Sequence, residues 1–187
     1  GARDLDIDHT YVTPLDVPQP DDCDPRPLRI PGEESIMSRI DLRLASAHAW
    51  EDLIGNPAEG GRSALWARIP DLLEPSAAAL AILGDYVPFG IGQALGQFAG
   101  GNSLDNTLRV VKIVPTEWVL LDIQVDGIAN GFGHGTVHLY AQDGTLMATA
   151  SQSTIVRFWA PERPGTRPQA DHTADDAPTI RGAEESI

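Results

Sequence analysis

The stretch EWVLLDIQVDGIANGFGHGTVHLYAQDGTLMATASQSTIV (117–156) decides the fold, because it contains three strand patterns and the turns between them. Its first run alternates, and the apolar residues that share one side are Val119, Leu121, Ile123 and Val125. The runs GTVHLYA (135–141) and LMATASQSTIV (146–156) follow, and the Asp143-Gly144 dipeptide between them is a strong hairpin signal. The Gly-rich run before residue 135 indicates a turn or bulge. The stretch therefore predicts antiparallel strands.

The last of these runs contains an amide where an apolar residue is expected. Alternation places one row on a single face of the strand: Leu146, Ala148, Ala150, Gln152, Thr154 and Val156. A buried amide without partners costs about 1–3 kcal/mol. Gln152 is therefore either a core amide bonded to a neighbour, an exposed residue with Ser151 and Ser153 buried instead, or a functional group.

Upstream residues predict further strands and one helix. SIMSRIDLRLA (35–45), SALWARIP (63–70) and LDNTLRVVKIV (104–114) are typical of strands, and the last would complete a four-strand meander. EPSAAALAILGDYV (74–87) predicts a helix that Pro88 ends or kinks. This helix is apolar almost all round, so we expect the protein to bury it.

The order of these elements favours an α+β domain in which a curved antiparallel sheet wraps around a central helix. After the helix, FGIGQALGQFAGGNS is Gly-rich and leads into the strands. It does not open a helix directly after a strand, so it lacks the context of a dinucleotide-binding loop.

The two ends of the chain differ from its centre in composition. Residues 1–33 are rich in Pro and Asp and are predicted to form a linker or surface segment. Residues 161–187 are predicted to be a disordered acidic tail. The folded domain is predicted at 34–160.

Composition limits the function. The chain has 187 residues and a formal charge of -14, which disfavours nucleic acid and anionic membrane surfaces as partners. Cys23 is the single cysteine, so no intrachain disulfide and no cysteine-based zinc site is possible. Without an apolar run near 18 residues or a signal-peptide pattern, we expect a cytoplasmic protein and no membrane insertion. The numbering begins at Gly1, which fits a piece of a longer product.

Four runs carry a resemblance to a known family: NSLDNTLRVV, PTEWVLLDIQV, NGFGHGTVHLYAQDG and LMATASQSTIVR. Over residues 35–158 they are similar to the C-terminal hotdog domain of the type II (TesB-like) acyl-CoA thioesterases. The resemblance implies a hotdog fold that is half of a double-hotdog arrangement. It also implies hydrolysis of acyl-CoA to free fatty acid and CoA, hence a role in fatty acid and lipid metabolism, without a cofactor.

The resemblance also implies a catalytic group of Asp, Thr or Ser, and Gln that activates a water without a covalent nucleophile. By its motifs the Asp is Asp105 and the Gln is Gln152. The hydroxyl position falls near Gly127-Ile128, where no Thr or Ser stands; Ser151, Thr154 or a backbone group could replace it.

The chemistry of these residues suits the reaction. A carboxylate can deprotonate an attacking water, and an amide can hold that water. Asp105 follows Gly100-Gly101, which permits close approach of a substrate. The alternative for Asp105 is an ordinary turn or cap residue.

Other functional interpretations are weaker or of another class. His134 and His138 share a strand face but lack a ligand pattern around them, which favours exposed or packing histidines and no metal site. A hotdog hydratase needs a His beside an Asp near the helix start, and no such pair is present. The alternative to a thioesterase is a non-catalytic acyl-CoA-binding or structural hotdog subunit. Because a single hotdog leaves a sheet edge free, we expect a homodimer or association with a second hotdog chain.

Overall fold

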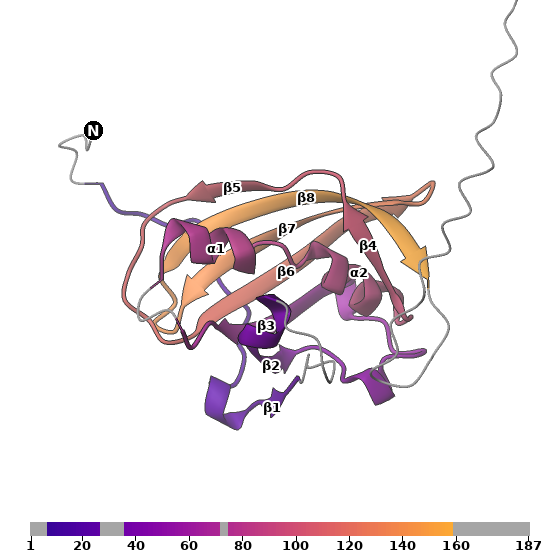
Figure 1. Cartoon of the computed structure of the whole chain (residues 1–187), viewed down its shortest axis with the longest axis horizontal. Helices are drawn as coiled ribbons and strands as arrows, with labels where there is room; N and C mark the ends of the chain where they lie inside the picture. The colour runs from indigo at the N-terminus through magenta and orange to yellow at the C-terminus, as the bar shows by residue number, and fades with distance from the viewer. Residues whose placement is uncertain (1–6, 27–35, 72–74, 159–187) are drawn as a thin grey trace, which may run out of the picture.

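The computed structural model describes residues 7–26, 36–71 and 75–158. One antiparallel sheet curls around two short helices (Figure 1). The strands are β1 (Asp24–Pro25), β2 (Asp41–Ser46), β3 (Arg62–Arg68), β4 (Ala99–Ser103), β5 (Thr107–Val110), β6 (Val119–Ala129), β7 (Phe132–Ala141) and β8 (Leu146–Phe158). The helices are α1 (Ala77–Leu83) and α2 (Val87–Leu95), and four 3-10 turns lie at Pro20–Asp22, Ile36–Arg39, Trp50–Asp52 and Glu59–Gly61.

The sheet has the order β1-β2-β3-β6-β7-β8-β4, and β5 also pairs with β8. The predicted fold class is confirmed: a curled antiparallel sheet encloses a central helical region, as in a hotdog fold. The predicted four-strand meander is wrong in one respect. The meander is β6-β7-β8, because β4 and β5 occupy the far edge of the long strand β8 one after the other.

Strand limits differ from the prediction at two places. The run 35–45 becomes a strand only at Asp41, after a 3-10 turn. In the run 104–114 only Thr107–Val110 is strand, and the Gly-rich residues before it supply β4. Leu146 also leaves the predicted row: the register shifts between Leu139 and Tyr140, so Leu146 packs on the outer face of the sheet beside Tyr140.

The predicted single helix is two helices. Ser76 caps α1 by accepting a hydrogen bond from Ala79 N, as its position in the sequence suggests. Pro88 lies in the first turn of α2 and does not end a helix, because the first turn needs no N–H from it. The first part of the Gly-rich run after it is helical, as far as Leu95. A Cβ on Gly90 would lie 2.6 Å from the Ile123 side chain, so glycine lets α2 lie against β6.

The helical region fills the concave face of the sheet. Its buried side chains pack with inward residues of β3, β6, β7 and β8: Leu65, Leu80, Leu83, Ile91, Leu121, Ile123, Val137, Leu139 and Met147 are examples. The span Ala77–Leu95, which contains α1 and α2, has 19 residues and a mean hydropathy of 1.3, so it is an apolar run of the length that the sequence analysis did not find. By length and composition alone such a run could cross a membrane, but a buried core helix meets the same criterion. As the core helix of this fold, 56% of its most apolar window is buried inside the protein.

The outer face of the sheet carries a smaller apolar cluster around Trp66, Trp118 and Tyr140. Leu15 and Val17 of the N-terminal segment pack against it, and Trp66 Nε1 donates a hydrogen bond of 2.8 Å to the Pro18 carbonyl. Strand pairing begins at Asp24, inside the predicted linker or surface segment. The predicted tail at 161–187 lies outside the described residues.

Candidate active site

Gln152 projects from the middle of β8 into the concave face. Its neighbours Ala148, Ala150 and Thr154 are buried and the residues between them are only half-buried, as strand alternation predicts. Gln152 itself is 3% exposed. The amide is therefore a buried polar group on a central strand and needs hydrogen-bond partners.

Two side chains supply those partners. Gln152 Nε2 donates a hydrogen bond to Asp85 Oδ1 and a second, of 2.5 Å, to Ser103 Oγ. Ser103 Oγ in turn donates to the same carboxylate oxygen over 3.2 Å. A carboxylate, a hydroxyl and an amide thus meet at one point, which we call the Asp85–Ser103–Gln152 triad.

The fold brings these residues together from three separate parts of the chain. Asp85 lies in the break between α1, which ends at Leu83, and α2, which starts at Val87. Ser103 is the last residue of β4, the strand that pairs with β8 beside Gln152. The hydrogen bonds fix the amide orientation, since only the NH₂ group can donate to a carboxylate.

One atom of the triad has no partner within the described residues. Gln152 Oε1 is buried and unpaired, whereas the carboxylate of Asp85 and the hydroxyl of Ser103 belong to exposed residues. An unsatisfied buried acceptor is unusual in a folded protein, and a catalytic role is one of the explanations for it. The triad is therefore open to solvent on the side of β4.

Tyr86 follows Asp85 and points into the core. Burial raises the pKa of Tyr86 to about 12, and the nearby Asp85 charge acts in the same direction. The phenol therefore stays neutral at ordinary pH. Asp85 is left with a neutral aromatic neighbour on the core side and solvent on the other.

Asp105 lies elsewhere. Its Oδ1 accepts a hydrogen bond of 2.9 Å from the backbone N–H of Ser153. Together with Gln152 it borders a cavity of about 330 Å³, whose other lining residues are Thr107, Asp126, His134, Gly135, Thr136, Ser151 and Ser153. Since His134, Thr136, Ser151 and Ser153 alternate with the inward Gln152, this cavity lies on the outer face of the sheet.

No direct hydrogen bond joins Asp105 to Gln152 in the part of the chain that the structure describes. The water that these two residues are predicted to share stays a prediction. The amide contacts that the structure does contain are those with Asp85 and Ser103.

The hydroxyl that the structure places beside Gln152 is Ser103, which the sequence analysis does not single out. Of the predicted substitutes, Ser151 borders the outer cavity and Thr154 Oγ1 donates to the Asn102 carbonyl. Two signals in the sequence could have identified the triad. Asp85 is the only charged residue in the apolar span 77–95, and Ser103 stands two residues before Asp105 in the same motif.

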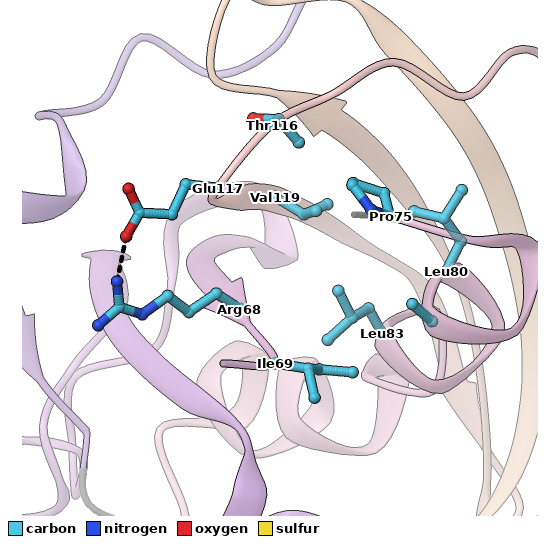
Figure 2. A pocket seen from close by; sticks show the side chains of 9 residues that line it. Arg68, Ile69, Pro75, Leu80, Leu83, Thr116, Glu117 and Val119 are labelled. Atoms are coloured by element: carbon cyan, nitrogen blue, oxygen red, sulfur yellow. Dashed lines mark hydrogen bonds and ion pairs between the residues drawn. The ribbon is translucent and has the colours of Figure 1, made fainter. Parts of the chain in front are cut away.

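A second, small and mainly apolar cavity lies beside α1 (Figure 2). It measures about 30 Å³, and its apolar lining comes from α1, from the residues just before α1 and just after β3, and from the start of β6. Its lining residues are Arg68, Ile69, Pro75, Ala79, Leu80, Leu83, Thr116, Glu117 and Val119. Arg68 and Glu117 form an ion pair at its mouth. In this state the cavity has the volume of about one water molecule, so an acyl chain would need further space.

His134 and His138 each contact a neighbouring side chain. His134 Nδ1 lies 3.1 Å from Ser153 Oγ, and the His138 ring stacks on Tyr140. Among the described residues no group of three or more His, Cys, Asp or Glu could hold a metal ion.

Comparison with known proteins agrees with this fold. The profile of the family described as acyl-CoA thioesterase C-terminal domain matches residues 20–156. The chain belongs to this family. The predicted resemblance to the type II acyl-CoA thioesterases is thereby confirmed.

Solved structures show the same architecture. A protein from Novosphingobium aromaticivorans that is assigned to the thioesterases is 33% identical with a TM-score of 0.67; the match covers 86% of this chain and 59% of that one. A hot dog fold protein from Alicyclobacillus acidocaldarius is 22% identical, with a TM-score of 0.68 and coverages of 86% and 60%. Acyl-CoA thioesterase II TesB2 from Mycobacterium marinum is 19% identical, with a TM-score of 0.53 and coverages of 84% and 60%.

The chain therefore spans about 60% of the length of these three structures. No curated protein sequence matches it.

Proposed function

We propose that this hotdog domain hydrolyses an acyl-CoA thioester to a free acid and CoA, with Asp85 as the base that activates a water. The observation that carries the proposal is the Asp85–Ser103–Gln152 triad, in which an amide and a hydroxyl both donate to one carboxylate oxygen. Membership of the acyl-CoA thioesterase C-terminal domain family supports the substrate class.

The triad suits the first step of the reaction. Ser103 and Gln152 hold Oδ1 of Asp85, which leaves Oδ2 as the oxygen that accepts a proton from water. The hydroxide formed attacks the thioester carbonyl carbon. The C–S bond then breaks, CoA leaves as the thiolate, and the proton passes from Asp85 to its sulfur.

The developing oxyanion needs donors close to Asp85. Helix α2 begins two residues after Asp85, and the first N–H groups of a helix have no partner within it. The N-terminus of this helix also carries a partial positive charge. We propose that it stabilises the thioester oxygen in the transition state.

A partner would cover the triad. Asp85 and Ser103 are exposed in the single chain, and several large apolar side chains along β5 and the loops beside it are also exposed. Among these, Leu104 is 55% and Val111 is 57% exposed. We propose that a second copy or a separate hotdog chain packs here and excludes water from the site. A stable monomer in analytical ultracentrifugation across a wide concentration range would count against this part.

Thiol release from a panel of acyl-CoAs tests the base. Asp85→Asn should lower kcat by about 10²- to 10⁴-fold, the usual contribution of a general base. Asp105→Asn distinguishes the two candidate bases, since Asp105 is the base in the interpretation that the sequence motifs favour. If Asp105→Asn shows this large loss of kcat and Asp85→Asn does not, the base is Asp105 and not Asp85.

The same assay tests the competing class of function. The wild-type chain is assayed alone and with a hotdog partner. If it binds acyl-CoA but releases no thiol in either setting, the protein is a non-catalytic acyl-CoA-binding or structural subunit.

A further inference from the structure

The position of Ser103 at the end of a strand needs an explanation. Ser103 pairs with Thr154 as the last residue of β4, and β5 begins only at Thr107. Strand ends fray, because they have lost the ladder on one side. Yet Ser103 Oγ must stay within hydrogen-bond reach of two partners, Gln152 at 2.5 Å and Asp85 at 3.2 Å.

On the side before Ser103, Thr154 holds the chain. Thr154 is completely buried, and its Oγ1 donates a hydrogen bond of 3.0 Å to the carbonyl of Asn102. A Cβ on Gly101 would lie 2.0 Å from this hydroxyl, so only glycine leaves room for it. A hydroxyl rather than a methyl group at residue 154 thus ties β8 to the residue next to Ser103.

On the side after Ser103, the backbone carbonyl and the backbone N–H of Ser153 both form hydrogen bonds with the chain. Leu104 N donates to the Ser153 carbonyl over 2.8 Å, and Ser153 N donates to Asp105 Oδ1 over 2.9 Å. The chain on both sides of Ser103 is therefore attached to residues 153 and 154, directly after Gln152.

We infer that Thr154 and Asp105 are positioning residues that hold the Ser103 hydroxyl against Asp85 and Gln152. This inference rests on the proposed function for its effect on rate, although the placement of Ser103 can be measured without it. Neither residue needs to touch the substrate. A shift of about 1 Å in a catalytic constellation can lower activity by roughly a hundredfold, which is the scale of effect available to such residues.

The first test is a pair of substitutions at Thr154. Thr154→Val keeps the volume and removes the hydroxyl, and it should lower kcat about ten- to a hundredfold with little change in KM. Thr154→Ser restores the donor and should recover most of the loss. Thr149→Val makes the same change on the outer face of β8 and should stay within about twofold of wild type.

The second test is at Asp105. Asp105→Ala removes the acceptor and should lower kcat, whereas Asp105→Asn keeps an Oδ1 that can accept from Ser153 and should recover much of the activity. Equal losses in both variants would overturn the positioning role of Asp105. Equal activity of Thr154→Val and Thr149→Val would overturn that of Thr154.

Amide hydrogen exchange separates this inference from the proposed function. In Thr154→Val the protection of the Leu104 amide should fall, and in Asp105→Ala that of the Ser153 amide should fall, while Thr149→Val changes neither. These losses of protection would support the positioning role of Thr154 and Asp105 even if no thiol release were found. Unchanged protection in both variants would overturn it, whatever the activity.

Discussion

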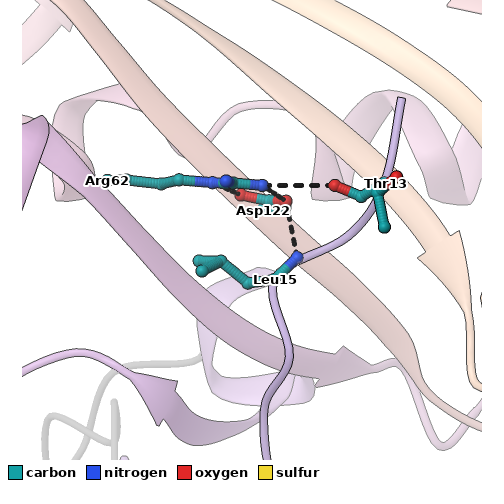
Figure 3. A network of polar contacts seen from close by, with 4 residues as sticks. All are labelled: Thr13, Leu15, Arg62 and Asp122. Atoms are coloured by element: carbon teal, nitrogen blue, oxygen red, sulfur yellow. Dashed lines mark hydrogen bonds and ion pairs between the residues drawn. The ribbon is translucent and has the colours of Figure 1, made fainter. Parts of the chain in front are cut away.

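The two faces of the sheet each contain a polar side chain that is almost completely buried, but its surroundings differ. On the outer face Asp122 is 2% exposed, and on the inner face Gln152 is 3% exposed. Both carboxylate oxygens of Asp122 are bonded: Oδ1 accepts from Arg62 Nε at 2.8 Å, and Oδ2 accepts from Arg62 at 2.5 Å and from Leu15 N at 3.1 Å (Figure 3). Gln152 leaves its carbonyl oxygen unpaired.

The difference separates a closed structural network from the open network that we propose to be catalytic. The second Arg62 nitrogen also reaches the Thr13 carbonyl, so the outer network joins β3, β6 and the N-terminal segment. The hydrogen bond from Arg62 to Asp122 raises the pKa of Arg62, so the guanidinium stays positively charged. The inner network ends instead in an unpaired acceptor and two exposed residues. A closed network stabilises a fold, and an open one can bind a ligand.

The largest effect is expected from breaking the closed network. Asp122→Leu leaves the Leu15 amide without its acceptor and Arg62 without its counter-ion. Because the Arg62 side chain is 38% exposed and can be rehydrated, we expect a loss of about 2–3 kcal/mol, below the range for fully buried pairs. Urea unfolding measures it, and limited proteolysis should show faster cleavage within residues 13–23. A loss below about 0.5 kcal/mol, the level of an ordinary surface substitution, would show that the network does not stabilise the outer face.

Gln152→Leu should have the opposite signature. It removes the unpaired acceptor, and its exposed partners Asp85 and Ser103 can turn to water. Thiol release should fall at least about tenfold, while the free energy of unfolding stays equal or rises by up to about 1 kcal/mol.

Gln93→Leu is the matched control for this prediction. Gln93 is 2% exposed, but both ends of its amide are paired with the His48 backbone, at 2.7 and 3.1 Å. Its loss should therefore destabilise the protein by about 1–3 kcal/mol. If Gln152→Leu destabilised the protein as much as Gln93→Leu, the contrast between closed and open networks would fail.

The same contrast explains what the sequence could predict. Strand alternation and the Asp143-Gly144 hairpin identified β6, β7 and β8, because each of these strands pairs with the strand that is next to it in the sequence. Gln152 was found as a break in that alternation. Asp85 and Ser103 were missed, since their meeting depends on a helix break and a strand end brought together by tertiary contacts that no local period records.

The catalytic role of Asp105 stays a prediction, and its position relative to Ser103 could not be predicted from the motif. Asp105 stands two residues beyond Ser103, and in a continuous strand residues two apart lie on the same face, so the sequence pattern does not distinguish the two positions. In the structure the chain leaves β4 at Ser103, so the two side chains meet different parts of β8. Helix α2 was missed for a related reason: glycine lowers helix propensity locally, but close packing against β6 favours it here.

A smaller effect is expected from the contact that holds the N-terminal segment over the outer apolar cluster. Trp66→Phe keeps most of the ring in the cluster but removes the Nε1–H that donates to the Pro18 carbonyl. One net hydrogen bond contributes about 1 kcal/mol, so unfolding should become easier by that amount. Thiol release should not change. A change in activity comparable to that of Gln152→Leu would mean that the outer and inner faces are coupled.

The smallest effect is expected at the exposed end of the same segment, where Lys112 Nζ pairs with Asp8 at 2.6 Å. The side chains are 39% and 72% exposed, and such pairs contribute about 0–1 kcal/mol because solvent and salt screen them. Lys112→Ala should therefore change the free energy of unfolding by less than about 0.5 kcal/mol, and the difference should vanish in high salt. Proteolysis within residues 7–12 measures the local effect, with Asp122→Leu as the comparison. If Lys112→Ala exposed the segment as strongly as Asp122→Leu does, its attachment would depend on surface charge and not on the buried network around Asp122.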